Sequence, residues 1–173
     1  MPHPTETSVL KVPGARLYYE VRGRGPLLLM IAGGPTDAGV FTALAQQLAD
    51  RYKVVTYDPR GNSRSPLDAP PADQDVDVHA DDAALETFAR IDMNMDYFIA
   101  HGLMPLSLYR PDIDRLRNAK TPVAIGIGEA SNQDAAGPGR ALAARLGTDP
   151  VAFPGDHGGY GPHAEAFAER LHA

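Results

Sequence analysis

The sequence of 173 residues contains no cysteine. This absence excludes a disulfide framework, a thiolate nucleophile and a zinc site of the cysteine type. Apolar runs are also short, and none approaches the roughly 20 residues that a membrane-spanning helix needs. We therefore expect no membrane partner.

Basic charge is scarce as well, because the formal net charge is −6. No basic stripe is present to neutralise phosphates, so we expect no nucleic-acid partner. Residues 1–14 lack the basic start and apolar stretch of a secretory signal, which favours a cytoplasmic location. No glycine-rich phosphate loop of either usual spacing occurs, and we expect no cofactor.

The remaining composition is that of a globular protein, with 43% hydrophobic and 22% charged residues. The length fits a single domain over residues 1–173 with one core. Apolar runs that end in glycine or proline alternate with segments of helical spacing. The pattern predicts an α/β fold, a mostly parallel sheet flanked by helices. The predicted strands are 15–23, 26–35, 52–61, 122–128 and 150–155, and the predicted helices are 38–52 (capped by Asp37), 79–103, 111–120, 139–147 and 161–173.

Two turns that follow predicted strands carry candidate chemistry. Gly33 and Gly34 in "IAGGPTDAG" let the backbone turn sharply and expose N–H groups that can stabilise an oxyanion. A plain strand-to-helix turn is the alternative interpretation. In "YDPRGNSRS" we expect Asp58 and Arg60 to brace the turn by a charge-assisted hydrogen bond. Gly61 supplies an unusual backbone angle there.

A third candidate pair follows the last two predicted strands. Glu129 stands in "GIGEAS" and His157 in "FPGDHGG". A carboxylate at the end of one strand can orient and charge-balance a histidine that follows the next strand.

Taken in this order, the three motifs resemble those of the α/β-hydrolase family, across nearly the whole chain. "AGGP" resembles the family's His-Gly-Gly-Pro oxyanion loop, with Ala32 where histidine is common. "DPRGNSRS" resembles its Asp-x-Arg-Gly-x-Gly-x-Ser turn, with Ser63 in the second glycine position. The resemblance implies that Glu129 is the catalytic acid and His157 the catalytic histidine.

The family's nucleophile elbow, Gly-x-Ser-x-Gly between a strand and a helix, has no counterpart here. Residues 79–86 join directly to 89–98, where the resemblance implies the elbow, a strand and a cap. The sequence therefore predicts a reduced α/β-hydrolase-like fold with an internal segment missing. In that fold the strand 26–32 lies beside the strand 122–128, and residues 79–103 form the crossover between them.

Three functions remain open. The first is hydrolysis of a small ester or lactone, with His157 as general base and no serine nucleophile. The second is a non-catalytic binding or scaffold protein with a vestigial site, and the third is a serine hydrolase with a relocated nucleophile, Ser63 or Ser65. The partner in each case is a small molecule. We expect no metal, because a loop that leads into a helix explains the acidic run 72–82 with His79 more simply than a metal site does.

The segment 79–104 holds more apolar residues than one helical stripe can bury against one sheet, Phe98 and Ile99 among them. A contiguous exposed apolar patch usually marks an interface. We therefore expect a homodimer that forms through residues 84–104.

Overall fold

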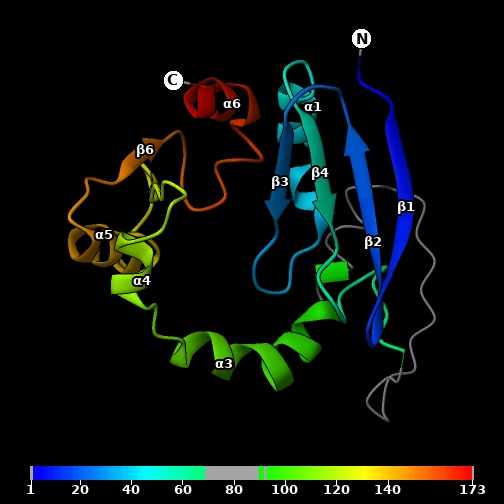
Figure 1. Ribbon diagram of the computed structural model, residues 1–173, viewed down its shortest axis with the longest axis horizontal. Helices are drawn as coiled ribbons and strands as arrows, with labels where there is room; N and C mark the ends of the chain where they lie inside the picture. The colour runs from blue at the N-terminus through cyan, green and yellow to red at the C-terminus, as the bar shows by residue number, and fades with distance from the viewer. Residues whose placement is uncertain (1, 69–89, 92, 173) are drawn as a thin grey trace. The chain divides into compact units, whose positions relative to one another are not determined.

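The computed structural model describes residues 2–68, 90–91 and 93–172 (Figure 1). The chain divides into two compact units, Met1–Leu108 and Tyr109–Ala173. The single domain over 1–173 stays a prediction.

The first unit is built on a four-stranded sheet in the order β1-β2-β4-β3. Its strands are β1 (Thr5–Val12), β2 (Ala15–Arg22), β3 (Leu27–Ile31) and β4 (Lys53–Tyr57). β2 pairs antiparallel with both β1 and β4, and only β3 and β4 pair in parallel. The predicted α/β class is confirmed, but a mostly parallel arrangement is wrong for this sheet, which is mixed.

The strand β1 explains much of this difference, because the sequence pattern did not predict it. Pro13 and Gly14 form the turn of a hairpin, in which Val12 lies opposite Ala15. Gly14 has a φ of +76°, a conformation that glycine adopts without strain. A tight hairpin joins its two strands in antiparallel fashion, whereas parallel strands need a long crossover.

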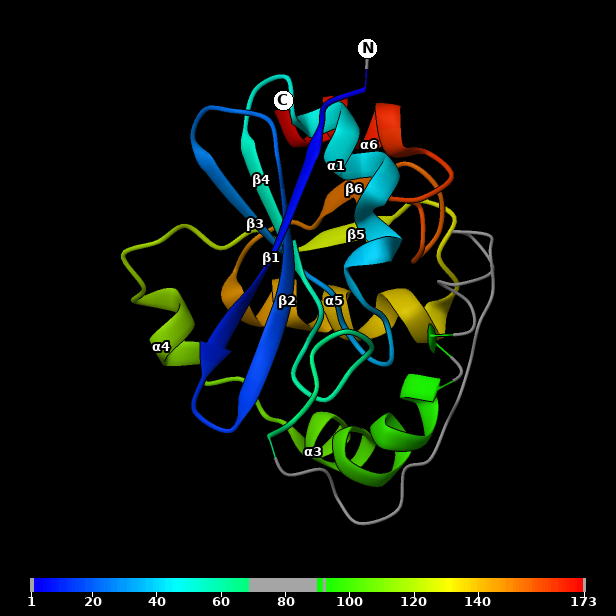
Figure 2. The same ribbon diagram turned by 90° about the vertical axis from the view of Figure 1, so that its right-hand side faces the viewer.

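One face of this sheet is covered by a short helical segment of the same unit. A 3₁₀ turn, η1 (Ala38–Phe41), leads into α1 (Thr42–Leu48). The predicted cap is confirmed, because the carboxylate of Asp37 accepts the N–H of Gly39. Leu44 and Leu48 are fully buried, as is Val54 on β4. Figure 2 shows α1 along one side of the sheet.

The described part of the predicted helix 79–103 is helical, while residues 79–89 and 92 lie outside the described residues. Residues 93–97 continue into a π-helical turn, η2 (Phe98–Gly102), and then into α3 (Leu103–Leu108). In the π turn the N–H of Leu103 donates to the carbonyl of Phe98. Pro105 follows within the same helix and has no N–H of its own, so a local departure from α geometry beside it is expected.

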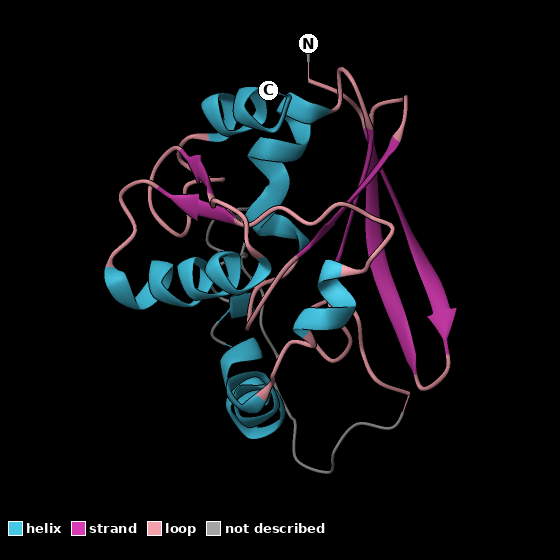
Figure 3. Cartoon of the chain, turned by 60° about the vertical axis from the view of Figure 1, so that its left-hand side comes forward, coloured by secondary structure: helices cyan, strands magenta, loops and turns pink. Residues whose placement is uncertain are grey.

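The second unit holds a separate two-stranded parallel sheet of β5 (Gly126–Gly128) and β6 (Val151–Phe153). Its helices are α4 (Ile113–Arg117), α5 (Gln133–Leu146) and α6 (Ala164–His172). Figure 3 shows the two strands between α5 and α6. Asn132 caps α5 at its start, and Gly147 ends it with a φ of +76°.

The predicted pairing of strand 26–32 with strand 122–128 would join the two units, and it stays a prediction. Only residues 126–128 of the later run reach strand geometry, and they pair with β6. The short βαβ connection through α5 brings β6 beside β5. An apolar run indicates a buried strand, but it does not specify which other strand pairs with it.

Candidate functional site

Glu129 and His157 both follow the carboxyl ends of the parallel strands β5 and β6. The N–H of Glu129 donates to the carbonyl of Phe153 at 2.9 Å, and the N–H of Ala130 donates to the carbonyl of Gly155, also at 2.9 Å. His157 lies on the loop after β6. The two residues therefore lie at the same edge of this small sheet.

Two glycines allow the loop after β6 to close over the end of β5. A Cβ on Gly128 would lie 2.3 Å from the carbonyl oxygen of Asp156. Gly155 has a φ of +81°, and a Cβ there would lie 2.5 Å from the ring of His163. Any other residue at either position would push the loop, and His157 with it, away from β5.

His157 lines a cavity of about 350 Å³ within the second unit. Polar groups of Ser131, Asp156 and Tyr160 line the same cavity. Its apolar wall includes the rings of Phe153 and Phe167, whose centroids lie 4.4 Å apart. An apolar cavity with a few polar groups that converge on it is typical of small-molecule sites.

Tyr160 presents a protonated phenol to this cavity at neutral pH. Burial raises the pKa of Tyr160, and the nearby carboxylate of Asp156 raises it further. Its ring packs edge-on against Phe167, with the centroids 6.4 Å apart. Tyr160 is therefore a hydrogen-bond donor or acceptor rather than a base.

Glu129 faces a different cavity, of about 410 Å³, which Glu169 and Arg170 also line. Within residues 93–172, no hydrogen bond or ion pair joins the carboxylate of Glu129 to His157. The carboxylate in the cavity of His157 is that of Asp156, which also accepts the N–H of Gly158 at 2.8 Å. The role of Glu129 as catalytic acid stays a prediction. Asp156 directly precedes His157 in the sequence, and this adjacency is the signal by which Asp156 could have been identified.

Gly33 and Gly34 belong to the first unit and follow β3. Gly34 has a φ of +61°, and a Cβ on either residue would meet no atom within 4 Å. Their carbonyls accept hydrogen bonds from Thr36 and Asn62. Among the described residues, neither glycine amide donates a hydrogen bond to another group. Both amides are thus available, and their role as oxyanion donors stays a prediction.

Ser65 serves the structure of the turn after β4. Its side chain is fully buried. Its hydroxyl accepts the N–H of Tyr18 at 2.8 Å and donates to the carbonyl of Asp58 at 2.8 Å. A serine in these two bonds is not poised to attack a substrate.

Ser63 is held in a comparable way. It adopts a φ of +47°, in the left-handed region, which explains why the resembling motif has a glycine at this position. Its hydroxyl donates to the carboxylate of Asp37 at 2.8 Å and accepts the side-chain amide of Asn94 at 2.9 Å. The N–H of Ser63 donates to the amide oxygen of Asn94 at 2.9 Å. These bonds stabilise the strained conformation.

The predicted pairing of Asp58 with Arg60 is wrong, because Asp58 pairs with Arg64. The guanidinium of Arg64 donates to Asp58 at 2.7 and 2.8 Å, whereas Arg60 donates to the carbonyl of Pro13 at 2.7 Å. Gly61, at a φ of +81°, gives the unusual backbone angle that was predicted. The turn at Gly61 carries the chain back, so that Arg64 rather than Arg60 reaches the carboxylate.

Asp37 joins the turn at Ser63 to Arg90, which lies in the described helical residues 90–91. Its carboxylate accepts the guanidinium of Arg90 at 2.5 Å as well as the hydroxyl of Ser63. Burial favours its protonated form, but the hydrogen bonds from Arg90, Ser63 and Gly39 outweigh burial and lower the pKa of Asp37. Asp37 is therefore ionised at neutral pH.

Within residues 2–68, 90–91 and 93–172, no three histidine or acidic side chains come together in a group that could hold a metal ion. The acidic run 72–82 with His79 lies outside the described residues. None of the helices in these ranges is both long and apolar enough to cross a membrane.

Known proteins resemble this chain in sequence and in fold. No protein-family model matches the sequence. An uncharacterised hydrolase, YraK of Bacillus subtilis (strain 168), is 50% identical over 74 residues, which are 43% of this chain and 27% of YraK. RutD of Agrobacterium fabrum (strain C58), provisionally named a carbamate hydrolase, is 28% identical over 110 residues, which are 58% of this chain and 41% of RutD.

Solved structures with low sequence identity share the fold. The crystal structure of E-2-(acetamidomethylene)succinate hydrolase matches with a TM-score of 0.56 at 17% identity, over 98% of this chain and 100% of that one. A membrane phospholipase A described as a bacterial virulence factor matches with a TM-score of 0.65 at 14% identity, over 97% of this chain and 86% of that one. Together with the sequence likeness to YraK and RutD, the shared fold supports a relationship to the α/β-hydrolase superfamily.

The relationship covers only part of the curated hydrolases. The matched segments span less than half of the length of YraK and of RutD. This partial coverage fits a shortened member of the α/β-hydrolase superfamily.

Proposed function

We propose that this α/β-hydrolase relative hydrolyses small esters or lactones, with His157 as general base. One observation carries the proposal: His157, Asp156, Ser131 and Tyr160 converge on one cavity at the carboxyl ends of β5 and β6. The names of the relatives support hydrolysis as the class of reaction. The volume of the cavity, about 350 Å³, fits a small substrate.

Water is the proposed nucleophile. His157 takes a proton from a water molecule as the water oxygen forms a bond to the ester carbonyl carbon. The tetrahedral intermediate then collapses, the bond between the acyl carbon and the leaving oxygen breaks, and protonated His157 returns the proton to the leaving alkoxide. The products are a carboxylic acid and an alcohol, so atoms and charge balance.

The bonding of the other serines supports this choice. The hydroxyls of Ser63 and Ser65 are both engaged within the first unit. Ser131 is the serine that shares the cavity of His157. The experiment must therefore distinguish attack by water from attack by Ser131.

The test measures hydrolysis of p-nitrophenyl acetate, p-nitrophenyl butyrate and a small γ-lactone by the purified chain. We expect His157→Gln to lower kcat/KM by roughly 10²–10⁴-fold, while Ser131→Ala changes it little. His101→Gln is the matched control, since His101 is an exposed histidine of the other unit. It should retain full activity.

Two outcomes contradict the proposal. A serine-directed phosphonate that labels the protein stoichiometrically, with loss of labelling in His157→Gln, shows a serine nucleophile. Absence of turnover together with saturable binding of the same esters identifies a non-catalytic binding protein.

A further inference from the structure

One face of the first unit's sheet is apolar and open. Leu27, Leu29 and Ile31 of β3 point to this face and are 71%, 51% and 61% exposed. The register places Val55 and Tyr57 of β4 beside them on the same face. α1 covers the opposite face (Figure 2). We call the side chains of these five residues the open sheet face.

The same unit also carries an apolar helix whose side chains are exposed. None of the residues of α3 is buried. The exposed apolar side chains from the π turn onward are Ile99, Leu103, Met104, Leu106 and Leu108, between 42% and 62% exposed. We call residues 99–108 the exposed helix. Within the first unit, the exposed helix does not cover the open sheet face.

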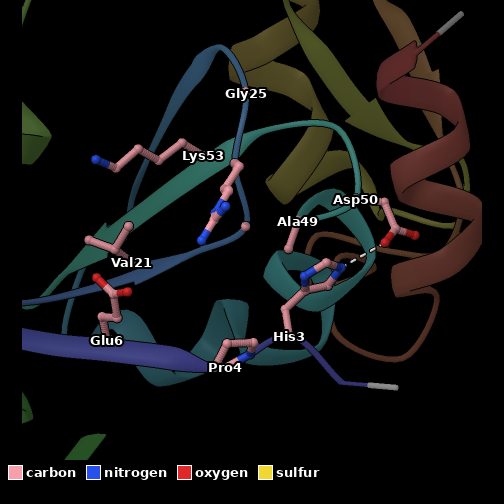
Figure 4. Close-up of a pocket in the computed structure, with 10 residues that line it drawn as sticks. His3, Pro4, Glu6, Val21, Gly25, Ala49, Asp50 and Lys53 are labelled. Atoms are coloured by element: carbon pink, nitrogen blue, oxygen red, sulfur yellow. Dashed lines mark hydrogen bonds and ion pairs between the residues drawn. The ribbon is translucent and has the colours of Figure 1, made fainter.

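The two surfaces match in chemistry. The exposed helix contains no charged residue apart from His101 when it is protonated. On the sheet, Lys53 of β4 lies opposite Leu27, at one end of the open sheet face (Figure 4). Residues 93–108 contain no lysine or arginine, and the chain has a net charge of −6, so the basic residues that favour binding to an anionic membrane are absent here.

Their area also matches what a dimer needs. A large apolar side chain buries roughly 100 Å² on transfer from water. Eight such side chains, each about half exposed, leave roughly 400–500 Å² of apolar surface on each copy. A standard interface takes about 800 Å² from each partner, a little over half of it apolar.

We propose that two copies of this chain associate reciprocally, the exposed helix of each lying on the open sheet face of the other. A two-fold axis makes the two contacts equivalent and closes the assembly as a dimer. This arrangement gives a geometry to the homodimer that the sequence predicts through residues 84–104. It does not depend on the proposed hydrolysis.

The first experiment measures the oligomeric state by sedimentation equilibrium between 1 and about 100 μM, where interfaces of this size commonly associate. We expect a dimer for the wild-type chain. Leu29→Asp and Leu106→Lys should each raise the dissociation constant at least 100-fold. Val9→Asp is the matched control, because Val9 is 55% exposed but lies on the other face of the sheet, opposite Tyr18; it should stay dimeric.

Mixing the variants tests reciprocity. A heterodimer of Leu29→Asp with Leu106→Lys has one unaltered contact and one contact between opposite charges, so we expect the mixture to dimerise again. All the substituted side chains are exposed in the single chain, and equal denaturation midpoints for the monomeric variants will verify their folding.

A cross-linking measurement does not rely on loss of stability. Because the chain has no cysteine, Leu29→Cys and Leu106→Cys introduce single thiols. A short bismaleimide should join one copy of each and should not join two copies of Leu29→Cys.

Several results overturn the proposal. One is a wild-type chain that stays monomeric over the whole concentration range, whether or not it floats with phosphatidylcholine vesicles. Another is a dimer that is dissociated by only one of the two charged variants. Such a dimer forms through a symmetric contact of sheet with sheet or of helix with helix instead. Cross-linking within a single chain that carries both cysteines, at any dilution, shows that the helix covers the sheet of its own chain.

Discussion

The polar residues that follow the strands differ in burial between the two units of this chain. In the first unit, Asp58 and Ser65 are fully buried, and each makes several hydrogen bonds. In the second unit, Glu129 and His157 are exposed and face cavities. A buried charge must be matched by partners, so its loss costs stability. An exposed group at a cavity is instead available for chemistry.

Deleting the carboxylate of Asp58 should give the largest contrast between the units. Asp58→Ala leaves the half-buried guanidinium of Arg64 and the N–H of Ala38 without their acceptor. We expect a loss of about 3–5 kcal/mol in the free energy of unfolding. Glu129→Ala should change it by less than about 0.5 kcal/mol. Urea denaturation followed by circular dichroism measures both, and equal losses for the two variants would refute the comparison.

A smaller contrast is expected between two serines. Ser65→Ala leaves the N–H of Tyr18 without its acceptor, which should cost about 1–3 kcal/mol. Ser131→Ala removes a hydroxyl from a cavity wall and should cost less than about 0.5 kcal/mol. The same denaturation experiment measures both values. A stable Ser65→Ala protein would show that water replaces the lost acceptor.

Glycine substitutions sharpen the comparison within the second unit, where backbone geometry rather than buried charge sets stability. Gly147→Ala places a side chain at a φ of +76° and should cost about 1–2 kcal/mol. Gly139→Ala, inside the same helix, would place its Cβ 3.4 Å from the side chain of Ile127, an ordinary van der Waals contact. It should stabilise the protein by about 0.5–1 kcal/mol. Thermal unfolding should show shifts of opposite sign, and shifts of the same sign would contradict this explanation.

The smallest contrast is expected from acidification. The pKa of Asp37 is lower in the folded chain than its usual value of 3.8, so the folded state holds fewer protons there than the unfolded state. The stability that Asp37 contributes is present above this usual value and is lost as the pH falls through the lower, folded pKa. Between about pH 5 and pH 3, wild type should lose more stability than Asp37→Asn. Parallel curves would show that Asp37 does not titrate with unfolding.

Local signals in the sequence predicted much of the fold. Asp37 caps the segment that leads into α1, Gly147 ends α5, and Gly61 turns the chain after β4. Each signal acts within about four residues, through a side-chain cap or a left-handed backbone angle. The positions of Glu129 and His157 after neighbouring parallel strands could also be predicted, because the ends of the apolar runs mark the ends of the strands.

Contacts between distant residues were harder to predict. The partner of Asp58 is Arg64, and the antiparallel pairing of β2 with β4 was also missed. The sequence pattern likewise missed β1, whose alternating residues remain exposed beside β2. Asp156 shares a cavity with His157, whereas Glu129 faces another one.

The sequence by itself determined the α/β class, the cap at Asp37, the end of α5 at Gly147 and the turn at Gly61. Only the tertiary structure decided the mixed direction of the sheet, the hydrogen bonding of Ser63 and Ser65, and the exposure of Leu29 and Leu106. The physical reason is range. Caps and turns depend on a few neighbouring residues, whereas pairing, burial and side-chain partners depend on which distant segments meet when the chain packs.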